Sequence, residues 1–369
     1  MPEVLDLPGP AAVVDLDRLE RNIHRIRAKA DGGGVRLRPH VKTHKSVEIA
    51  RLQFAGGTGP VTVSTLKEAE HFARSGFDDI TYAVPLNPAL LDRAAELAAK
   101  VERFHLLIDH PDLLEAVEGR PAPPLSFYLK VDCGYHRAGV DPEARASLAL
   151  ARRLHESQAA NLAGILTHAG QAYRCRNREE LLAVAKTERE TMVRFASRLE
   201  EAGIPVPEIS IGSTPTMAVA GNLDGITEIR PGNYVFHDRF QAAIGACSPD
   251  DIAFSVHGTV VGMYPERGRF LLNTGALALS RDPGADHLGR SFGFGEVYDP
   301  ARPGEPPIGV IESLSQEHGL ARAGADLPLL GAPVRITPNH SCLAAAGFER
   351  YYAVRGTRIE GEMQPCRGW

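Results

Sequence analysis

The feature that most constrains the fold is a regular alternation of short strand-like and longer helix-like segments over the first two thirds of the chain. Helical apolar spacing appears over residues 88–100, 142–156 and 178–202. Eight intervening segments carry apolar runs typical of buried parallel strands; they span residues 35–42, 61–64, 80–84, 103–109, 125–132, 162–168, 208–213 and 227–234. Eight such units in about 200 residues predict an α/β fold, a (β/α)8 TIM barrel. A doubly wound open sheet is the alternative, because strand closure cannot be derived from one sequence.

The sequence texture changes after residue 234. Helical periodicity gives way to alternating or β-branched runs separated by Gly- and Pro-rich turns; these runs span residues 252–263, 269–279, 307–313, 333–338 and 350–355. The pattern predicts a second, C-terminal all-β domain. We place the barrel at residues 16–240 and the β-rich domain at residues 241–369, and we expect residues 1–15 to pair with the β-rich domain.

Composition and charge exclude several classes of protein. A formal net charge of −5 without a basic tract argues against a nucleic-acid partner. The first residues lack a basic region followed by an apolar run, and no stretch approaches the ~18 apolar residues of a membrane helix, so we expect neither secretion nor a membrane partner. The odd number of cysteines, five, suits free thiols in a reducing compartment. A cytoplasmic location follows as the expectation.

Polar side chains gather where the predicted strands end, which is the end of a barrel that carries chemistry. The side chains concerned are Arg38, His40 and Lys42, then Arg137, His168, Gln171 and Tyr173, and finally Arg230. The last two strands lead into Gly-, Ser- and Thr-containing loops that suit a phosphate; these loops contain Gly212, Ser213, Thr214, Gly232 and Asn233. Singly, each residue is better explained as an ordinary loop residue or a polar cap.

Together these residues predict a phosphate-bearing ligand facing a lysine across the barrel mouth. A lysine in a cationic neighbourhood suits Schiff-base chemistry, which points to pyridoxal phosphate. The residues alone do not choose between Lys42 and Lys45.

A candidate metal site lies in the β-rich domain, where His340 and Cys342 are separated by one residue. In extended backbone such residues project to the same side, so both side chains can reach one ion. An imidazole and a thiolate suit Zn²⁺, and two protein ligands leave positions for substrate and water. The alternative is a buried cysteine beside a hydrogen-bonded histidine. Gln316, Glu317 and His318 offer further polar groups without a diagnostic spacing.

Nine sequence blocks, in order along nearly the whole chain, match a known family. They are LRPHVKTHK (37–45), VSTLKEAE (63–70), LKVDCGYHRAGV (129–140), THAGQAY (167–173), IGSTPT (211–216), RPGNYVFHD (230–238), QEHG (316–319), PNHSC (338–342) and RGW (367–369). The chain resembles the eukaryotic-type D-serine dehydratases, within the D-threonine aldolase and alanine racemase-like (fold type III) pyridoxal phosphate enzymes. This resemblance implies a homodimer whose active sites form between the barrel of one chain and the β domain of the other.

The resemblance also implies roles for individual residues. Lys42, rather than Lys45, would form the Schiff base with the cofactor, while His168 would stack on the pyridine ring, Tyr173 would contact its nitrogen and Arg137 would lie near its hydroxyl. Ser213, Thr214, Gly232 and Asn233 would hold the phosphate, and we add His40 and Tyr234 to the cofactor contacts. His340 and Cys342 would bind zinc, or another divalent metal such as Mn²⁺ or Mg²⁺.

Arg230 is a departure from the dehydratases, which tend to have histidine there, whereas racemase-like relatives carry arginine facing the ring nitrogen. An arginine would not protonate that nitrogen, so the ring would be a weaker electron sink and the metal would contribute more.

The resulting expectation is a lyase acting on a small D-β-hydroxy amino acid. Lys42 would remove the Cα proton and the metal would coordinate the β-hydroxyl as it leaves, converting D-serine to pyruvate and ammonia. The alternatives are a D-threonine aldolase, which gives glycine and an aldehyde, and a dehydratase or aldolase for 3-hydroxy-D-aspartate. A cofactor carrier without enzymatic activity should lack the β domain and the pair His340 and Cys342. An amino-acid racemase, also less favoured, would use a second base from the β domain, usually a tyrosine, opposite the lysine.

Overall fold

The computed structural model describes residues 3–120 and 123–369, which form two compact units. One, called here the barrel unit, comprises residues 25–232 with residues 368–369. The other, the β unit, comprises residues 3–24 and 233–367. Residues 233–240 belong with the β unit because Phe240 N donates to Asn339 O (3.1 Å) and Ser341 N donates to Asp238 Oδ2 (3.0 Å). The barrel unit thus begins nine residues after, and ends eight residues before, the bounds of 16 and 240 that we predicted.

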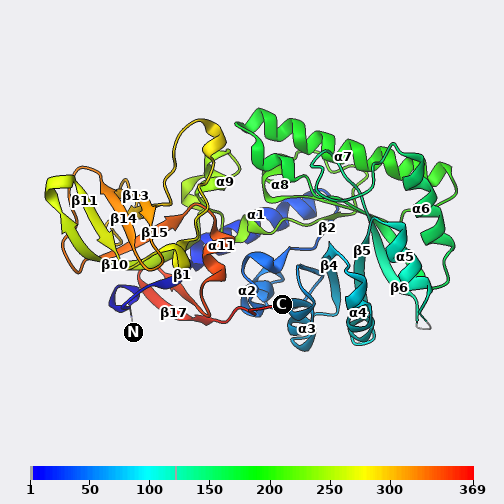
Figure 1. Ribbon diagram of the computed structural model, residues 1–369, viewed down its shortest axis with the longest axis horizontal. Helices are drawn as coiled ribbons and strands as arrows, with labels where there is room; N and C mark the ends of the chain where they lie inside the picture. Colours follow the sequence, from blue (N-terminus) through cyan, green and yellow to red (C-terminus); the bar gives the residue numbers. More distant parts are fainter. Residues whose placement is uncertain (1–2, 121–122) are drawn as a thin grey trace. The chain divides into compact units, whose positions relative to one another are not determined.

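Eight parallel strands form the sheet of the barrel unit, in the order β2-β9-β8-β7-β6-β5-β4-β3. Strands β2, β4, β5 and β6 are labelled in Figure 1. They are β2 (Arg36–Leu37), β3 (Val61–Val63), β4 (Asp79–Pro85), β5 (Arg103–Ile108), β6 (Leu125–Lys130), β7 (Ala160–Leu166), β8 (Glu208–Ile211) and β9 (Glu228–Ile229). An isolated parallel bridge between His40 and Thr62 joins the two end strands, so the sheet curls into a barrel that a single bridge closes. The predicted barrel is confirmed, with all eight strands at the predicted places.

Helices connect the strands as the periodicity predicts. They are α1 (Leu16–Gly32), α2 (Val47–Gln53), α3 (Leu66–Arg74), α4 (Leu91–Ala98), α5 (Pro111–Glu118), α6 (Arg145–Glu156), α7 (Arg178–Glu201) and α8 (Thr214–Val219). Polar caps define where several begin, because a side-chain oxygen satisfies an amide of the first turn; Ser46 accepts from Ile49 N and Thr65 from Glu68 N. No helix within the described residues is both long and apolar enough to span a lipid bilayer.

The barrel unit contains a charged layer, which we define as Arg36, Arg38, Asp79 and Glu228; Arg36 and Asp79 are partly exposed. Arg38 is fully buried; its Nε donates to Glu228 Oε2 (2.7 Å) and its Nη1 contacts the Asp79 carboxylate. Glu228, also fully buried, accepts from Arg36 Nε (2.8 Å) and from Ser210 Oγ (2.7 Å). Branched apolar side chains usually fill this position in barrels, so the layer is a departure from the common pattern.

The β unit is built on a nine-stranded sheet in the order β11-β14-β13-β12-β15-β10-β1-β16-β17, with an additional pairing of β11 to β10. Its strands are β1 (Ala11–Asp15), β10 (Phe254–Tyr264), β11 (Arg269–Leu272), β12 (Gly295–Tyr298), β13 (Gly309–Leu314), β14 (Gly319–Ala323), β15 (Pro333–Pro338), β16 (Tyr351–Arg355) and β17 (Arg358–Met363). Three short helices accompany them: α9 (Arg239–Ala243), α10 (Ala276–Leu279) and α11 (Ser341–Ala346). The predicted C-terminal β domain is confirmed, and β1 lies inside its sheet.

The alternation predicted for residues 333–338 is visible in β15. Val334 and Ile336 are fully buried on one face, while Arg335 and Thr337 lie on the other. Sequence patterning missed β12, β14 and β17. It also merged residues 269–279 into one run, which the structure divides into β11 and α10.

Several short 3-10 segments complete the connections. They are η1 (Val4–Asp6), η2 (Val41–Thr43), η3 (Pro88–Leu90), η4 (Gly170–Arg174), η5 (Asn233–Val235), η6 (Pro249–Asp251), η7 (Pro265–Arg267) and η8 (Asp286–Leu288). Two of them, η2 and η4, carry candidate site residues.

Candidate functional site

The structure distinguishes Lys42 from Lys45. Both follow β2, but Lys45 Nζ forms an ion pair with Glu68 Oε1 at 2.9 Å, and that carboxylate is fully buried. Lys42 lies in η2, and its charge acts on His40 and on His168. Lys45 is therefore committed to a structural pair, whereas Lys42 faces the other candidate site residues.

The strand ends of the barrel unit bring cations and imidazoles together. Burial, with the charges of Lys42 and Arg230, lowers the pKa of His40 well below its usual value. Burial likewise lowers the pKa of His168 far below its usual value, with contributions from Lys42 and Lys130. Both imidazoles are therefore neutral at neutral pH, and His40 Nδ1 is buried without a hydrogen-bond partner among the described residues.

Lys130, at the end of β6, was missed by the sequence analysis. Its side chain is almost fully buried, and burial with the charges of Arg230 and Arg137 lowers its pKa to about 7. The only sequence signal was a lysine inside an otherwise apolar strand.

A loop after β6 places Arg137 and Tyr135. Asp132 Oδ1 accepts hydrogen bonds from the backbone N–H groups of residues 134, 135 and 136, at 2.9 to 3.0 Å. The Arg137 guanidinium lies 5.0 Å from the centre of the Tyr135 ring, and that ring packs edge-on against His168 at 6.3 Å. Tyr173, in η4, also lies near His168, with ring centres 6.5 Å apart. The structure thus gathers the aromatic candidates around His168.

Arg230, at the end of β9, is held rigidly. Its Nε donates to Ser210 Oγ (2.6 Å) and its Nη2 donates to Thr167 O and to Ser210 O (3.3 Å).

The buried carboxylate of Glu188, on α7, accepts from Ala169 N and Gly212 N, both at 3.1 Å. Burial raises the pKa of Glu188. No sequence signal identified Glu188, because it occupies one position in the buried stripe of an ordinary amphipathic helix.

The loops expected to hold a phosphate follow β8 and β9. Ser213 caps α8 through a capping box with Thr216, while Thr214 is the first residue of that helix. Gly232 is packed closely: a Cβ there would lie 2.7 Å from the carbonyl oxygen of His40 and 3.0 Å from the Cβ of His40. A side chain at position 232 would therefore push against the segment that carries Lys42.

This arrangement fits an anionic, aldehyde-bearing cofactor. The cluster contains three cationic side chains (Lys42, Arg137 and Arg230), one lysine whose pKa is lowered to about 7 (Lys130), two neutral imidazoles and one carboxylate whose pKa is raised. Lys130 and Arg230 are buried, whereas Lys42 and Arg137 are exposed. The local excess of positive charge attracts an anion. A phosphate group would supply the compensation, and Lys42 would supply the amine.

The metal candidates lie at a strand-to-helix turn of the β unit. His340 follows β15 in extended backbone, but Cys342 lies in the first turn of α11, so the two do not share the continuous extended backbone we assumed. His340 Nδ1 hydrogen-bonds Asp282 Oδ2 at 2.9 Å. Although burial opposes it, hydrogen bonds to Asp282 and Cys342 raise the pKa of His340 to about 11.

The donor set fits a borderline-soft metal ion. Imidazole and thiol are adjacent, and the carboxylate on Nδ1 fixes the ring orientation, as is usual for metal-binding histidines. Among the described residues, no group of three or more His, Cys, Asp or Glu side chains is placed so that it could hold a metal ion. His340 and Cys342 would therefore supply two ligands.

Asn233 and Tyr234 belong to the β unit. The Asn233 amide donates to Asp238 Oδ2 (3.0 Å), Ser341 Oγ (2.9 Å) and Cys342 Sγ (3.4 Å), so its side chain supports the metal candidates, although we assigned it to the phosphate. Tyr234 is buried in η5. Residues 316–318 form the turn between β13 and β14, where Ser315 N donates to His318 O.

Comparison with known proteins matches both units. Residues 14–239 match the model described as "Alanine racemase, N-terminal domain", and residues 253–354 match "Putative serine dehydratase domain". The chain is 41% identical to the D-threo-3-hydroxyaspartate dehydratase of Delftia sp. HT23, over 99% of each chain. It is 33% identical to the D-serine dehydratase of Dictyostelium discoideum, over 100% of this chain and 98% of the relative.

Solved structures agree with these matches. The structure of the Delftia enzyme superposes with a TM-score of 0.93 at 38% identity, covering 100% of both chains. The D-threonine aldolase of Filomicrobium marinum superposes with a TM-score of 0.83 at 26% identity, covering 98% of this chain and 95% of that one. The predicted resemblance is confirmed: the chain belongs to the alanine racemase-like family of pyridoxal phosphate enzymes, as a lyase of the D-serine dehydratase branch.

Proposed function

We propose that the protein eliminates water from D-β-hydroxy amino acids, using pyridoxal phosphate and a divalent metal, most simply converting D-serine to pyruvate and ammonia. The observation that carries this proposal is the pairing, in one chain, of the cationic cluster around Lys42 with the His340–Cys342 donor set. When bound, the cofactor supplies an electron sink for the Cα carbanion, and the metal supplies a Lewis acid for the departing hydroxyl.

Residues of the barrel unit would divide the work between binding and proton transfer. Lys42 would hold the cofactor and move the Cα proton with its amine. His168, with Tyr135 and Tyr173 beside it, would orient the pyridine ring of the cofactor. Arg230 would face the ring nitrogen, with its guanidinium held in position by Ser210 and Thr167. An arginine held this way does not give its proton to the ring nitrogen, so the ring would be a weaker electron sink. The metal held by His340 and Cys342 would then contribute more to the elimination.

In the β unit, His340 and Cys342 would hold the metal, with Zn²⁺ the best match to their softness. Two solved variants of the Delftia enzyme replace a histidine and a cysteine that are two positions apart, and the cysteine variant is described as metal-free. The same spacing here supports the assignment.

Elimination is favoured over retro-aldol cleavage because two dehydratase relatives, at 41% and 33% identity over nearly the whole chain, are more similar to this chain than the D-threonine aldolase of Arthrobacter sp., at 30% over 90% of this chain. The second substrate candidate is D-threo-3-hydroxyaspartate, on which the Delftia relative is named to act.

The deciding experiment is to incubate the protein with pyridoxal phosphate and Zn²⁺ and to supply D-serine, D-threonine or D-threo-3-hydroxyaspartate separately. We expect a 2-oxo acid and ammonia from a dehydratase, and the ranking of kcat/KM identifies the substrate. Glycine as the main product from D-threonine would establish the aldolase alternative. EDTA should abolish turnover, whereas a racemase would be insensitive to it. Lys42→Ala should lose the visible absorbance of the bound cofactor, and Lys45→Ala is the matched control.

We also propose a cytoplasmic homodimer in which each active site combines Lys42 of one subunit with His340 and Cys342 of the other, as the family resemblance implies. The test is to mix inactive Lys42→Ala and Cys342→Ala chains. A shared site predicts recovery of up to about a quarter of the wild-type activity by random pairing. Mixed chains that stay inactive, although they exchange subunits, would contradict the shared site.

A further inference from the structure

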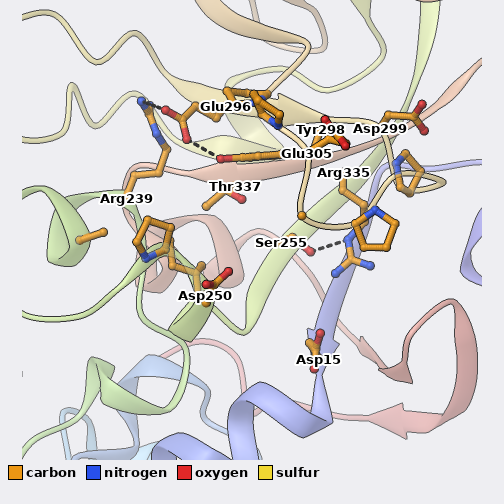
Figure 2. Close-up of a pocket in the computed structure, with 18 of the residues that line it drawn as sticks. Asp15, Arg239, Asp250, Ser255, Glu296, Tyr298, Asp299, Glu305, Arg335 and Thr337 are labelled. Atoms are coloured by element: carbon orange, nitrogen blue, oxygen red, sulfur yellow. Dashed lines mark hydrogen bonds and ion pairs between the residues drawn. The ribbon is translucent and has the colours of Figure 1, made fainter.

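The β unit contains a cavity of about 610 Å³ whose lining includes none of the residues assigned to the cofactor or the metal. One wall is the polar face of the sheet, where Ser255, Glu296, Tyr298, Arg335 and Thr337 project from β10, β12 and β15 (Figure 2). Its volume lies within the range of small-molecule sites.

Most charged groups that line this cavity are already paired. Arg239 donates to Glu296 Oε1 (2.8 Å), and the second oxygen of Glu296 accepts from the Tyr298 hydroxyl (2.7 Å). Asp15 Oδ1 accepts from Arg18 N (3.0 Å), and Asp15 Oδ2 lies 3.5 Å from Arg18 Nε. These pairs leave no spare carboxylate oxygen on Glu296.

Two arginines of the lining have no carboxylate partner among the described residues: Arg290, which lies over the Phe292 ring, and Arg335. The Nε of Arg335 donates to Ser255 Oγ at 2.8 Å, and no carboxylate within the described part of the chain approaches it to ion-pair distance. Figure 2 shows the rest of its guanidinium turned away from Ser255 into the open space. Burial, with the charge of Arg18, lowers its pKa to about 10, although Asp15 opposes the shift. A guanidinium in this position lacks an anion.

A second donor lies beside Arg335 on the same strand face. Thr337 also lines the cavity, and its hydroxyl has no hydrogen-bond partner among the described residues. Residues two positions apart in a strand project to the same side of the sheet. The Thr337 hydroxyl and the terminal amino groups of Arg335 can therefore contact the same ligand.

The surrounding charges select the kind of anion. The lining contains five arginines and five carboxylates: Arg18, Arg239, Arg290, Arg302 and Arg335, with Asp15, Asp250, Glu296, Asp299 and Glu305. This balance disfavours a dianion such as phosphate, whereas the planar edge of one guanidinium matches the two oxygens of a carboxylate. We propose that the cavity is a binding site for a small monocarboxylate, which Arg335 holds through its terminal amino groups while Thr337 donates a further hydrogen bond.

The probe for the test is trifluoroacetate, titrated into the holoenzyme and followed by ¹⁹F NMR, with acetate as competitor. We expect saturable binding that acetate reverses and that Arg335→Gln weakens by at least about tenfold. The matched control is Arg267→Gln, which removes an exposed arginine outside the cavity and should bind as the wild type does.

Thr337→Val keeps the side-chain shape and provides a second variant should Arg335→Gln fold poorly. Weaker binding by a few-fold in Thr337→Val supports the proposal. Equal binding by wild type, Arg335→Gln and Thr337→Val would overturn it. Displacement of the probe by inorganic phosphate at the same concentration as acetate would overturn the assignment to a monocarboxylate.

Discussion

Replacing Glu228 by glutamine tests the charged layer of the barrel unit. Glu228 is fully buried and accepts hydrogen bonds from Arg38, Arg36 and Ser210. The substitution keeps the shape but removes the charge, so Arg38, which is itself fully buried, keeps only Asp79 as an acidic partner among the described residues. Breaking a buried ion pair in this way costs about 3–5 kcal/mol of the free energy of unfolding.

The assay is urea unfolding followed by far-UV circular dichroism at pH 7. The control is Glu362→Gln, because Glu362 pairs with Arg350 at the surface (3.1 Å), where both side chains are about half exposed. Exposed pairs of this kind contribute about 0–1 kcal/mol. If the two variants lost the same stability, the reasoning about burial would be refuted.

The pH dependence of this layer has a definite sign. Burial alone would raise the pKa of Glu228, but Arg38 and Arg36 outweigh it and lower that pKa. A carboxyl with a lowered folded-state pKa contributes stability that is complete above the unfolded value of about 4.3 and is lost as the pH falls through the folded-state pKa. The stability difference between wild type and Glu228→Gln should therefore shrink on acidification below about pH 4.

Three further substitutions address the site. Gly232→Ala brings a Cβ to 2.7 Å from the His40 carbonyl, so we expect cofactor affinity, measured from its absorbance, to fall about tenfold or more. Asp282→Asn weakens the partner that orients His340, and Zn²⁺ affinity measured by chelator competition should fall roughly 10–100-fold. Asp132→Ala releases three backbone amides of the loop that carries Arg137, which should weaken cofactor binding while circular dichroism stays unchanged.

Each of these variants has a matched control in the same unit. Gly221→Ala adds a Cβ with no neighbour within 4 Å, while Asp286→Asn and Asp112→Ala alter exposed carboxylates. A control that behaves like its test variant would assign the effect to general destabilisation.

Local patterns predicted the fold well because period and composition are local properties. Strand ends followed from the sequence, and so did the gathering of Lys42, His168 and Arg230 at one end of the barrel. The direction in which each side chain points did not follow from the sequence. Arg38 stands in the same strand-end segment as His40, yet it points into the charged layer, where its partner Glu228 is 190 residues away.

The metal candidates show the same limit. The spacing of His340 and Cys342 was visible, but the start of α11 between them was not, and neither was Asp282, which lies 58 residues before His340. Lys130 and Glu188 were missed because a single polar residue inside an apolar pattern does not by itself indicate a functional role. Only the fold shows that each is buried among charged groups.

The place of β1 has a consequence for biosynthesis. This strand lies inside the nine-stranded sheet, antiparallel to β10 and parallel to β16. Residues 11–15 are synthesised before both of these partner strands. Strand β1 can therefore complete its pairing only after residues 254–264 and 351–355 have left the ribosome. Until both partner strands have emerged, at least one hydrogen-bonding edge of β1 stays unpaired, so slow synthesis or premature termination leaves an aggregation-prone strand. Removing the first fifteen residues would deprive the unit that carries His340 and Cys342 of an interior strand.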